Sequence, residues 1–184
     1  MSPMKRKRVL AVLAVGLVVA VAAGLYWFQP WKLWVNETVQ EALPVAAQPS
    51  AQPSVQTSGS ATPAPKEPAV VATGALISHE HTTSGDVRIL RAADGSLVLR
   101  LENLDTSNGP DLRVWLTDAP VIPGKGGWFV FDDGAYVSAG KLKGNKGSQN
   151  YTLPAGTDLA RYSSVTIWCE RFSVSFGAAE LKKV

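Results

Sequence analysis

Cys169 is the only cysteine in the chain, and it stands between Trp168 and Glu170 near the C-terminus. A single cysteine has no partner for an internal disulfide, so two interpretations are open. Outside the reducing cytoplasm a lone thiol is prone to oxidation, and a redox role is one reason to retain it. In that case Arg171 would lower its pKa and favour the reactive thiolate. The alternative is a small, inert side chain buried in the core.

His79 and His81, the only two histidines, are the second group that could do chemistry. On a strand, alternate residues face the same side, so both imidazoles could reach one metal ion. With Cys169 they would form a His₂Cys set, of the kind that copper or zinc accepts. The methionines, Met1 and Met4, offer no axial ligand. The alternative is that one or both histidines are solvated at a strand end.

Haem ligation through Cys169, with or without a histidine, is also possible in kind. The double-cysteine attachment motif is absent, so any haem would be held non-covalently. Asp105, Asp111 and Asp118 lack the spacing of a calcium loop and are typical of turns. No Ser-His-Asp order or nucleophile elbow supports hydrolysis.

The N-terminal segment predicts a membrane anchor. A basic tail (residues 1–8) precedes an apolar run (9–28), about 20 residues or roughly 30 Å of helix, which matches the bilayer core. The basic residues should stay in the cytoplasm and the tryptophans that follow should lie at the far interface, which places the rest of the chain outside. A cleaved signal peptide, with a site at Ala20-Val21-Ala22, is the alternative.

The region from 29 to 72 reads as a juxtamembrane stretch followed by a linker rich in Pro, Ala and Ser. Such a composition buries too little apolar surface to offset its ordering entropy, so we expect a disordered spacer. Six of the 18 basic and three of the 15 acidic residues precede Thr73, which leaves 12 of each in the domain at 73–184. A neutral domain lacks the positive charge that nucleic-acid binding needs.

Short runs of β-branched and aromatic residues, separated by turn signals, recur through the domain. About eight short strands of this kind predict an all-β antiparallel sandwich or barrel-like domain. Asp94-Gly95 predicts a tight hairpin. The apolar residues that alternate with polar ones, and should face the core, are Leu99, Leu101, Val114, Leu116, Val165 and Ile167.

The parity of the apolar residues changes after Cys169. Val165, Ile167 and Cys169 share one face of a strand, whereas Phe172, Val174 and Phe176 have the opposite parity. One unbroken strand cannot place both sets inside, so we expect a bulge or tight turn at residues 170–171, with Cys169 at the rim of the core. The alternative keeps Trp168 inside and leaves Cys169 outside.

Three long motifs together resemble the DM-thirteen domain, often called the electron-transfer DM-thirteen family: GALISHEHTTSGDVRIL, LRLENLDTSNGPDLRVWLTDA and LKGNKGSQNYTLPAGTDLARYSSVTIWCERFSVSFGAAEL. The resemblance covers nearly all of residues 73–181. It implies electron transfer through one characteristic cysteine, which matches Cys169, either as a free thiol or holding a prosthetic group such as haem. In animals such domains occur beside DOMON domains, whereas here the domain stands alone on an anchor of bacterial type.

We therefore expect a single-pass membrane protein with an extracytoplasmic β domain. Its predicted role is an accessory redox module rather than a stand-alone enzyme, with Cys169 as the redox group and His79 and His81 as helpers. Haem or copper is the cofactor to consider, and the partners would be the membrane and a redox or cell-surface protein. The alternative is a non-catalytic binding or structural module on the cell surface, in which the cysteine is inert.

Overall fold

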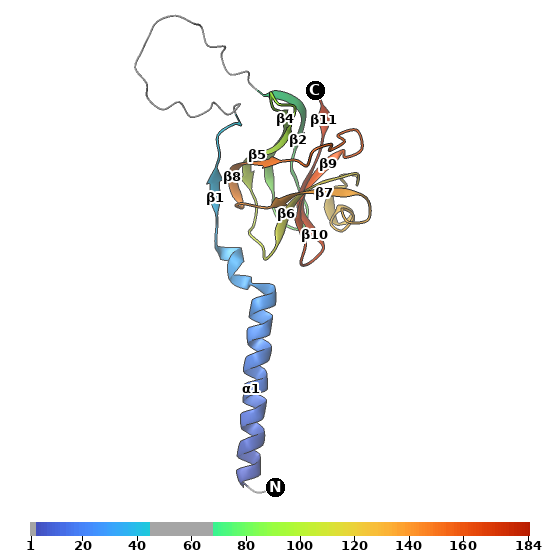
Figure 1. The fold of residues 1–184 in the computed structure, drawn as a ribbon. Coiled ribbons are helices and arrows are strands. Elements are labelled where there is room, and N and C mark those ends of the chain that lie inside the picture. Colours follow the sequence, from blue (N-terminus) through green and yellow to red (C-terminus); the bar gives the residue numbers. More distant parts are fainter. Residues whose placement is uncertain (1–2, 45–67) are drawn as a thin grey trace, which may run out of the picture.

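A computed structural model of the chain describes residues 3–44 and 68–184. The spacer expected from composition falls largely on residues 45–67, which lie outside this range. In the described part, one long N-terminal helix leads into a domain built from two β-sheets (Figure 1). The all-β prediction is confirmed in its sandwich form, because the described strands do not close into one barrel.

The first sheet has six strands, in the order β1-β8-β5-β4-β2-β11. All neighbours in it run antiparallel except β1 and β8, which are parallel. The strands are β1 (Thr38–Gln40), β2 (Ala69–Ala75), β4 (Ser84–Arg91), β5 (Leu97–Asp105), β8 (Lys146–Thr152) and β11 (Lys182–Lys183). The expected hairpin at Asp94-Gly95 joins β4 to β5, and Gly95 there has a positive φ of 85°.

The second sheet has five strands, in the order β3-β10-β9-β6-β7. Its neighbours are all antiparallel. The strands are β3 (Ile77–Ser78), β6 (Leu112–Thr117), β7 (Tyr136–Lys141), β9 (Ser164–Cys169) and β10 (Val174–Glu180). A short 3₁₀ helix, η2 (Gly124–Gly127), lies in the long connection between β6 and β7.

The main core lies between the two sheets. The six residues expected to face it are all fully buried there, which confirms the alternation read from the sequence. The second sheet is also covered on its outer face, where Trp115 and Trp168 pack with Ala119 and Phe131 of the β6–β7 connection. Every residue of β9 is buried in consequence, so the strand is not half-solvated as an alternating pattern suggests.

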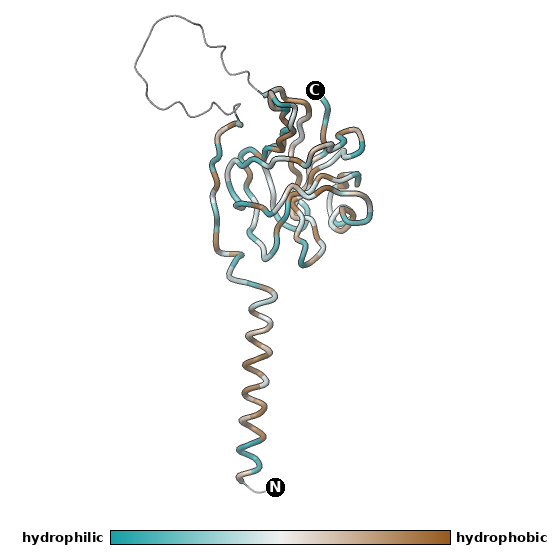
Figure 2. The backbone as a smooth tube through the Cα atoms, in the orientation of Figure 1, coloured by the Kyte–Doolittle hydropathy of each residue, from teal (hydrophilic) through white to brown (hydrophobic). Residues whose placement is uncertain are grey.

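Helix α1 (Pro3–Phe28) is long and apolar enough to cross a membrane, with a mean hydropathy of 2.6 in its most apolar window. Figure 2 shows hydrophilic residues near its N-terminal end and hydrophobic ones along most of the rest. None of that window is buried against the protein. By length and composition the helix could equally be a signal sequence. A 3₁₀ helix, η1 (Pro30–Trp34), follows it.

Residues 35–42, here called the strap, join the domain directly after η1. Strand β1 lies within the strap and pairs with β8, and Lys146 N donates to Glu37 O at 3.1 Å. Asn145 Oδ1 accepts a hydrogen bond from Glu37 N, and its Nδ2 donates to Asn36 Oδ1. The chain thus contacts the sheet only a few residues beyond α1, within the region expected from the sequence to be linker.

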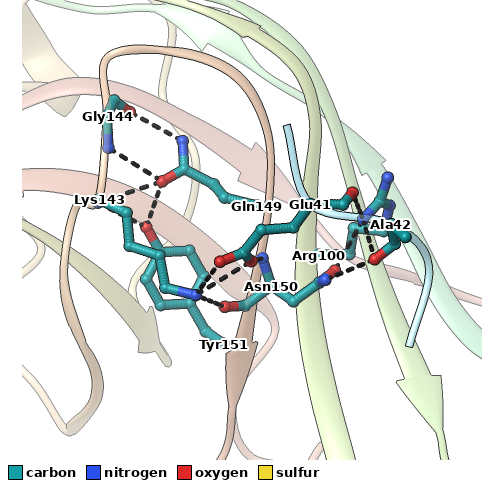
Figure 3. Close-up of polar contacts among 8 residues, drawn as sticks. All are labelled: Glu41, Ala42, Arg100, Lys143, Gly144, Gln149, Asn150 and Tyr151. Carbon is teal, nitrogen blue, oxygen red and sulfur yellow. Dashed lines mark hydrogen bonds and ion pairs between the residues drawn. The ribbon is translucent and has the colours of Figure 1, made fainter. Parts of the chain in front are cut away.

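Glu41 and Ala42 fasten the far end of the strap (Figure 3). The Glu41 carboxylate accepts hydrogen bonds from Lys143 Nζ at 2.7 and 3.0 Å and from Asn150 N at 2.6 Å. Arg100 Nη1 donates to the Glu41 carbonyl at 3.0 Å, and Asn150 Nδ2 donates to Ala42 O at 2.8 Å. The Lys143 ammonium holds the pKa of Glu41 below its ordinary value.

We expect Glu41→Gln to loosen the strap, because it removes the charge that Lys143 and Asn150 hold. The pKa of Glu41 is lower in the attached strap than in a detached one, so attachment is favoured at neutral pH and weakens as pH falls through that lowered value. Hydrogen exchange at Thr38–Gln40 measures this. Exchange relative to the intrinsic rate should rise at acidic pH in wild type and already be raised at neutral pH in the variant. Equal protection in both proteins at neutral pH would contradict the prediction.

Candidate functional site around Cys169

Cys169 is the last residue of β9 and is 0% exposed. In the second sheet it pairs with Leu112 of β6 and with Val174 of β10. Its side chain belongs to the core between the sheets, with Val165 and Ile167 on the same face. The thiol is therefore inside the core rather than outside it, and the alternative with Trp168 inside and Cys169 outside is wrong.

The chain turns sharply after Cys169, as the change of parity predicted. Residues 170–173 form the turn, Phe172 N donates to Cys169 O at 3.3 Å, and Ser173 has a positive φ of 48°. Val174 and Phe176 both reach the main core, and a bulge between Ser175 and Gly177 in β10 then shifts the register, so that Ala179 faces the main core and Ala178 the outer cluster.

Burial raises the pKa of the Cys169 thiol, and the backbone N–H groups of the turn offset this only in part. Arg171 lowers the pKa of the thiol as expected, but only through its backbone N–H, and burial outweighs this, so the thiolate is not favoured. The Arg171 guanidinium points to the end of α1, where Nη1 donates to Trp27 O at 2.6 Å and the group lies 5.3 Å from the Trp27 ring. Its positive charge therefore lies at the C-terminal carbonyls of the helix, where a cation is favoured.

An apolar groove of about 350 Å³ lies between the turn and the end of α1. Phe28 of the helix stacks on Phe172 of the turn, with ring centroids 5.7 Å apart. Cys169 does not line the groove. Val174, which pairs with Cys169 in the sheet, and Phe172, whose N–H donates to the Cys169 carbonyl, both line it. Other lining residues include Pro30, Leu33, His81, Pro110 and Phe176. A larger, more polar groove near Thr73 and Lys182 contains none of the candidate residues.

His79 is 7% exposed and belongs to the outer side of the second sheet. Its Nδ1 lies 2.7 Å from Ser175 Oγ, which lies 2.8 Å from Thr166 Oγ1, so the three side chains form a buried polar chain. The Nε2 atom has no hydrogen-bond partner among the described residues. Burial lowers the pKa of His79, and the nearby Ile122 carbonyl opposes this in part.

We expect His79 to make the domain less stable at mildly acidic pH. Its pKa is lower in the folded protein than in the unfolded chain, so the folded state resists protonation. The contribution of neutral His79 to the free energy of unfolding is complete above the ordinary pKa of histidine. It is lost as pH falls through the lowered pKa of the folded protein. Chemical denaturation at a series of pH values measures it. His79→Gln should flatten this pH dependence, whereas a variant with an unchanged pH profile would contradict the assignment.

His81 occupies a different environment from His79. Its ring lies on Phe176, with centroids 3.9 Å apart, and its Nε2 lies 2.6 Å from Glu80 Oε2. The two imidazoles were expected on one face of a strand, but β3 ends at Ser78 and residues 79–81 form a bend, so strand alternation does not apply to them.

The structure does not bring His79, His81 and Cys169 together as ligands of one metal ion. Within residues 3–44 and 68–184, no group of three or more His, Cys, Asp or Glu side chains is placed to hold a metal ion. His81 lines the apolar groove, Cys169 lies in the core beside it, and His79 lies with the outer aromatic cluster.

Sequence reasoning missed the hydroxyl chain of Ser175 and Thr166 and the pairing of Phe28 with Phe172. A signal for the first existed, since Thr166 and Ser175 are polar residues inside otherwise apolar strands. No local signal could reveal the second, because it joins residues far apart in the chain.

Fold and site together define a small two-sheet β domain with one buried cysteine at the end of a central strand, joined to an apolar N-terminal helix. The family model described as electron transfer DM13 matches residues 75–181. The chain belongs to the electron transfer DM13 family, which indicates a role related to electron transfer. No curated protein and no solved structure matches the chain.

Proposed function

We propose that the protein is a membrane-anchored, extracytoplasmic electron-transfer module in which Cys169 is the redox group. The proposal is carried by the enclosure of Cys169 in the core, one strand partner away from a residue that lines the groove beside the end of α1. Val174, the partner of Cys169 in β10, and Phe172, whose N–H donates to the Cys169 carbonyl, both line the groove together with Phe28 of the helix. A redox group so placed is close to the membrane surface and shielded from water.

The membrane placement rests on the N-terminal residues. The run Lys5–Arg8 precedes the apolar stretch and favours a cytoplasmic N-terminus, with the domain on the other side. Arg171 and Phe172 contact the end of α1, and the strap joins the sheet just beyond η1. These contacts favour a domain seated close to the anchor, and an accessory module with a membrane or cell-surface redox partner fits this arrangement.

The residues do not fit haem or copper. The Cys169 side chain is enclosed in the core, and neither histidine shares its surroundings. We therefore propose the free thiol as the redox group. Because the thiol is buried and its pKa is raised, its oxidation to a thiyl radical would release one electron through the protein to the redox partner and one proton to water, and both would return on reduction.

A second candidate function is a non-catalytic surface or structural module with an inert cysteine. Complete burial and a raised pKa favour it, because structural buried cysteines have these properties. The two functions differ in what the loss of the sulfur does.

The experiment uses the full chain in proteoliposomes with a soluble one-electron mediator dye. Cys169→Ala should abolish protein-dependent electron exchange with the dye. Val165→Ala is the matched control, because it truncates a fully buried residue on the same face of β9 and leaves the sulfur in place. Loss of exchange only in Cys169→Ala supports the redox module. Equal exchange in all three proteins, or equal loss in both variants, supports the inert cysteine.

A further inference from the structure

Three aromatic side chains form a continuous stack across the second sheet. The rings of Tyr136 and Trp115 lie 3.9 Å apart at an interplanar angle of 8°. Those of Trp115 and Trp168 lie 5.3 Å apart at 27°. The residues come from three neighbouring strands, β7, β6 and β9, so the sheet itself fixes their spacing. Tyrosine and tryptophan are the side chains most readily oxidised by one electron among the aromatic residues.

The stack runs from the surface to the interior. Tyr136 is 46% exposed, whereas Trp115 and Trp168 are buried. Phe131 covers Trp168 edge-on at 6.3 Å and closes the inner end to water. Trp168 is also the residue before Cys169, so the inner end of the stack is one peptide unit from the thiol residue.

We propose that Tyr136, Trp115 and Trp168 form a relay that carries single electrons between the surface of the domain and its interior beside Cys169. This inference rests on the proposed electron-transfer function and adds its route. The outer residue of the stack is a tyrosine that is 46% exposed, so the phenolic proton that it loses on oxidation can pass to water. Close stacking matters because electron transfer slows steeply with distance, and the stack divides one long step into two short ones.

The relay has a defined electron balance. A one-electron oxidant, such as a metal complex or the metal centre of a partner, leaves a radical cation on Trp168. Trp115 gives one electron to Trp168, and Tyr136 gives one to Trp115. Tyr136 also releases its phenolic proton to water. The oxidant is reduced by one electron, both tryptophans are restored, and a neutral tyrosyl radical remains at the surface until a one-electron reductant and a water proton return it to the phenol.

Flash photolysis of the full chain in detergent tests the relay. An ultraviolet flash ejects electrons from tryptophan, an irreversible cobalt(III) acceptor removes them, and the tryptophanyl and tyrosyl radicals are followed by their separate absorption bands. All proteins carry Tyr26→Phe, because Tyr26 adjoins Trp27 in the anchor. We expect a tyrosyl radical to form in a first-order phase whose rate is independent of protein concentration.

Tyr136→Phe should remove most of this phase, and Trp115→Phe should remove it while Tyr136 is still present. Tyr162→Phe is the matched control and should leave it intact, because Tyr162 lies outside the stack. Tyr136 is at the surface, so its variant decides the question even if Trp115→Phe fails to fold. An unchanged phase in Tyr136→Phe would overturn the relay. If mediator exchange still depended on Cys169, the proposed function would stand without it.

Discussion

Cys169 in the folded, full-length protein should react with a soluble thiol reagent about 10³-fold more slowly than in the unfolded chain, if exposing it needs roughly 4 kcal/mol of local opening. The side chain is enclosed between the sheets at the end of β9. The reagent can reach the sulfur only when the 170–173 turn or a neighbouring strand opens. The raised pKa slows the reaction further, because less thiolate is present at neutral pH.

The measurement is the rate of thiol modification in native buffer and in denaturant, at the same pH and reagent concentration. Ala93→Cys in a Cys169→Ala background is the control, because Ala93 is exposed at the tip of the β4–β5 hairpin. Its thiol should react at nearly the same rate in both conditions. A native Cys169 that reacts as fast as this control would contradict the enclosed position and would favour a directly accessible redox thiol.

Trp168→Ala should lower the free energy of unfolding by about 3–5 kcal/mol, the range expected for a fully buried aromatic side chain. Trp168 is 1% exposed and contacts both Trp115 and Phe131. Its removal leaves a cavity beneath the β6–β7 connection and uncovers the outer face of β9. The same change interrupts the proposed relay at its inner end.

Denaturant titration of the full chain measures this loss. Trp34→Ala is the control, since Trp34 is 78% exposed and its removal should leave the domain stability unchanged. If Trp168→Ala were as stable as Trp34→Ala, the outer cluster would not be packed as described, and the second sheet would have only one buried face.

Most of the strands between residues 84 and 178, the hairpin at Asp94-Gly95 and the break after Cys169 could be predicted from the sequence. Each depends on local properties: β-branched runs, alternation with period two, and turn residues whose backbone preferences are independent of the rest of the fold. Parity left two positions open for Cys169, and the core confirms the one in which it shares a face with Val165 and Ile167.

The contacts that decide the chemistry could not be predicted in this way, because they join distant segments. Arg171 is next to the cysteine turn in sequence, yet its guanidinium bonds to Trp27 O. The burial of Trp168 on the face opposite Cys169 depends on Phe131, which a long connection brings over the sheet. The three-residue strand β1 pairs with β8 in a region whose composition is that of a linker. In each case tertiary contact overrode the local pattern.

Voltammetry of the full chain, immobilised on an electrode beneath a lipid film, shows whether Cys169 makes this domain an electron-transfer module. We expect a redox wave in wild type and in Val165→Ala that is absent from Cys169→Ala, with all three proteins folded by circular dichroism. Identical voltammograms for wild type and Cys169→Ala would contradict it and would leave Cys169 as a structural residue of the core.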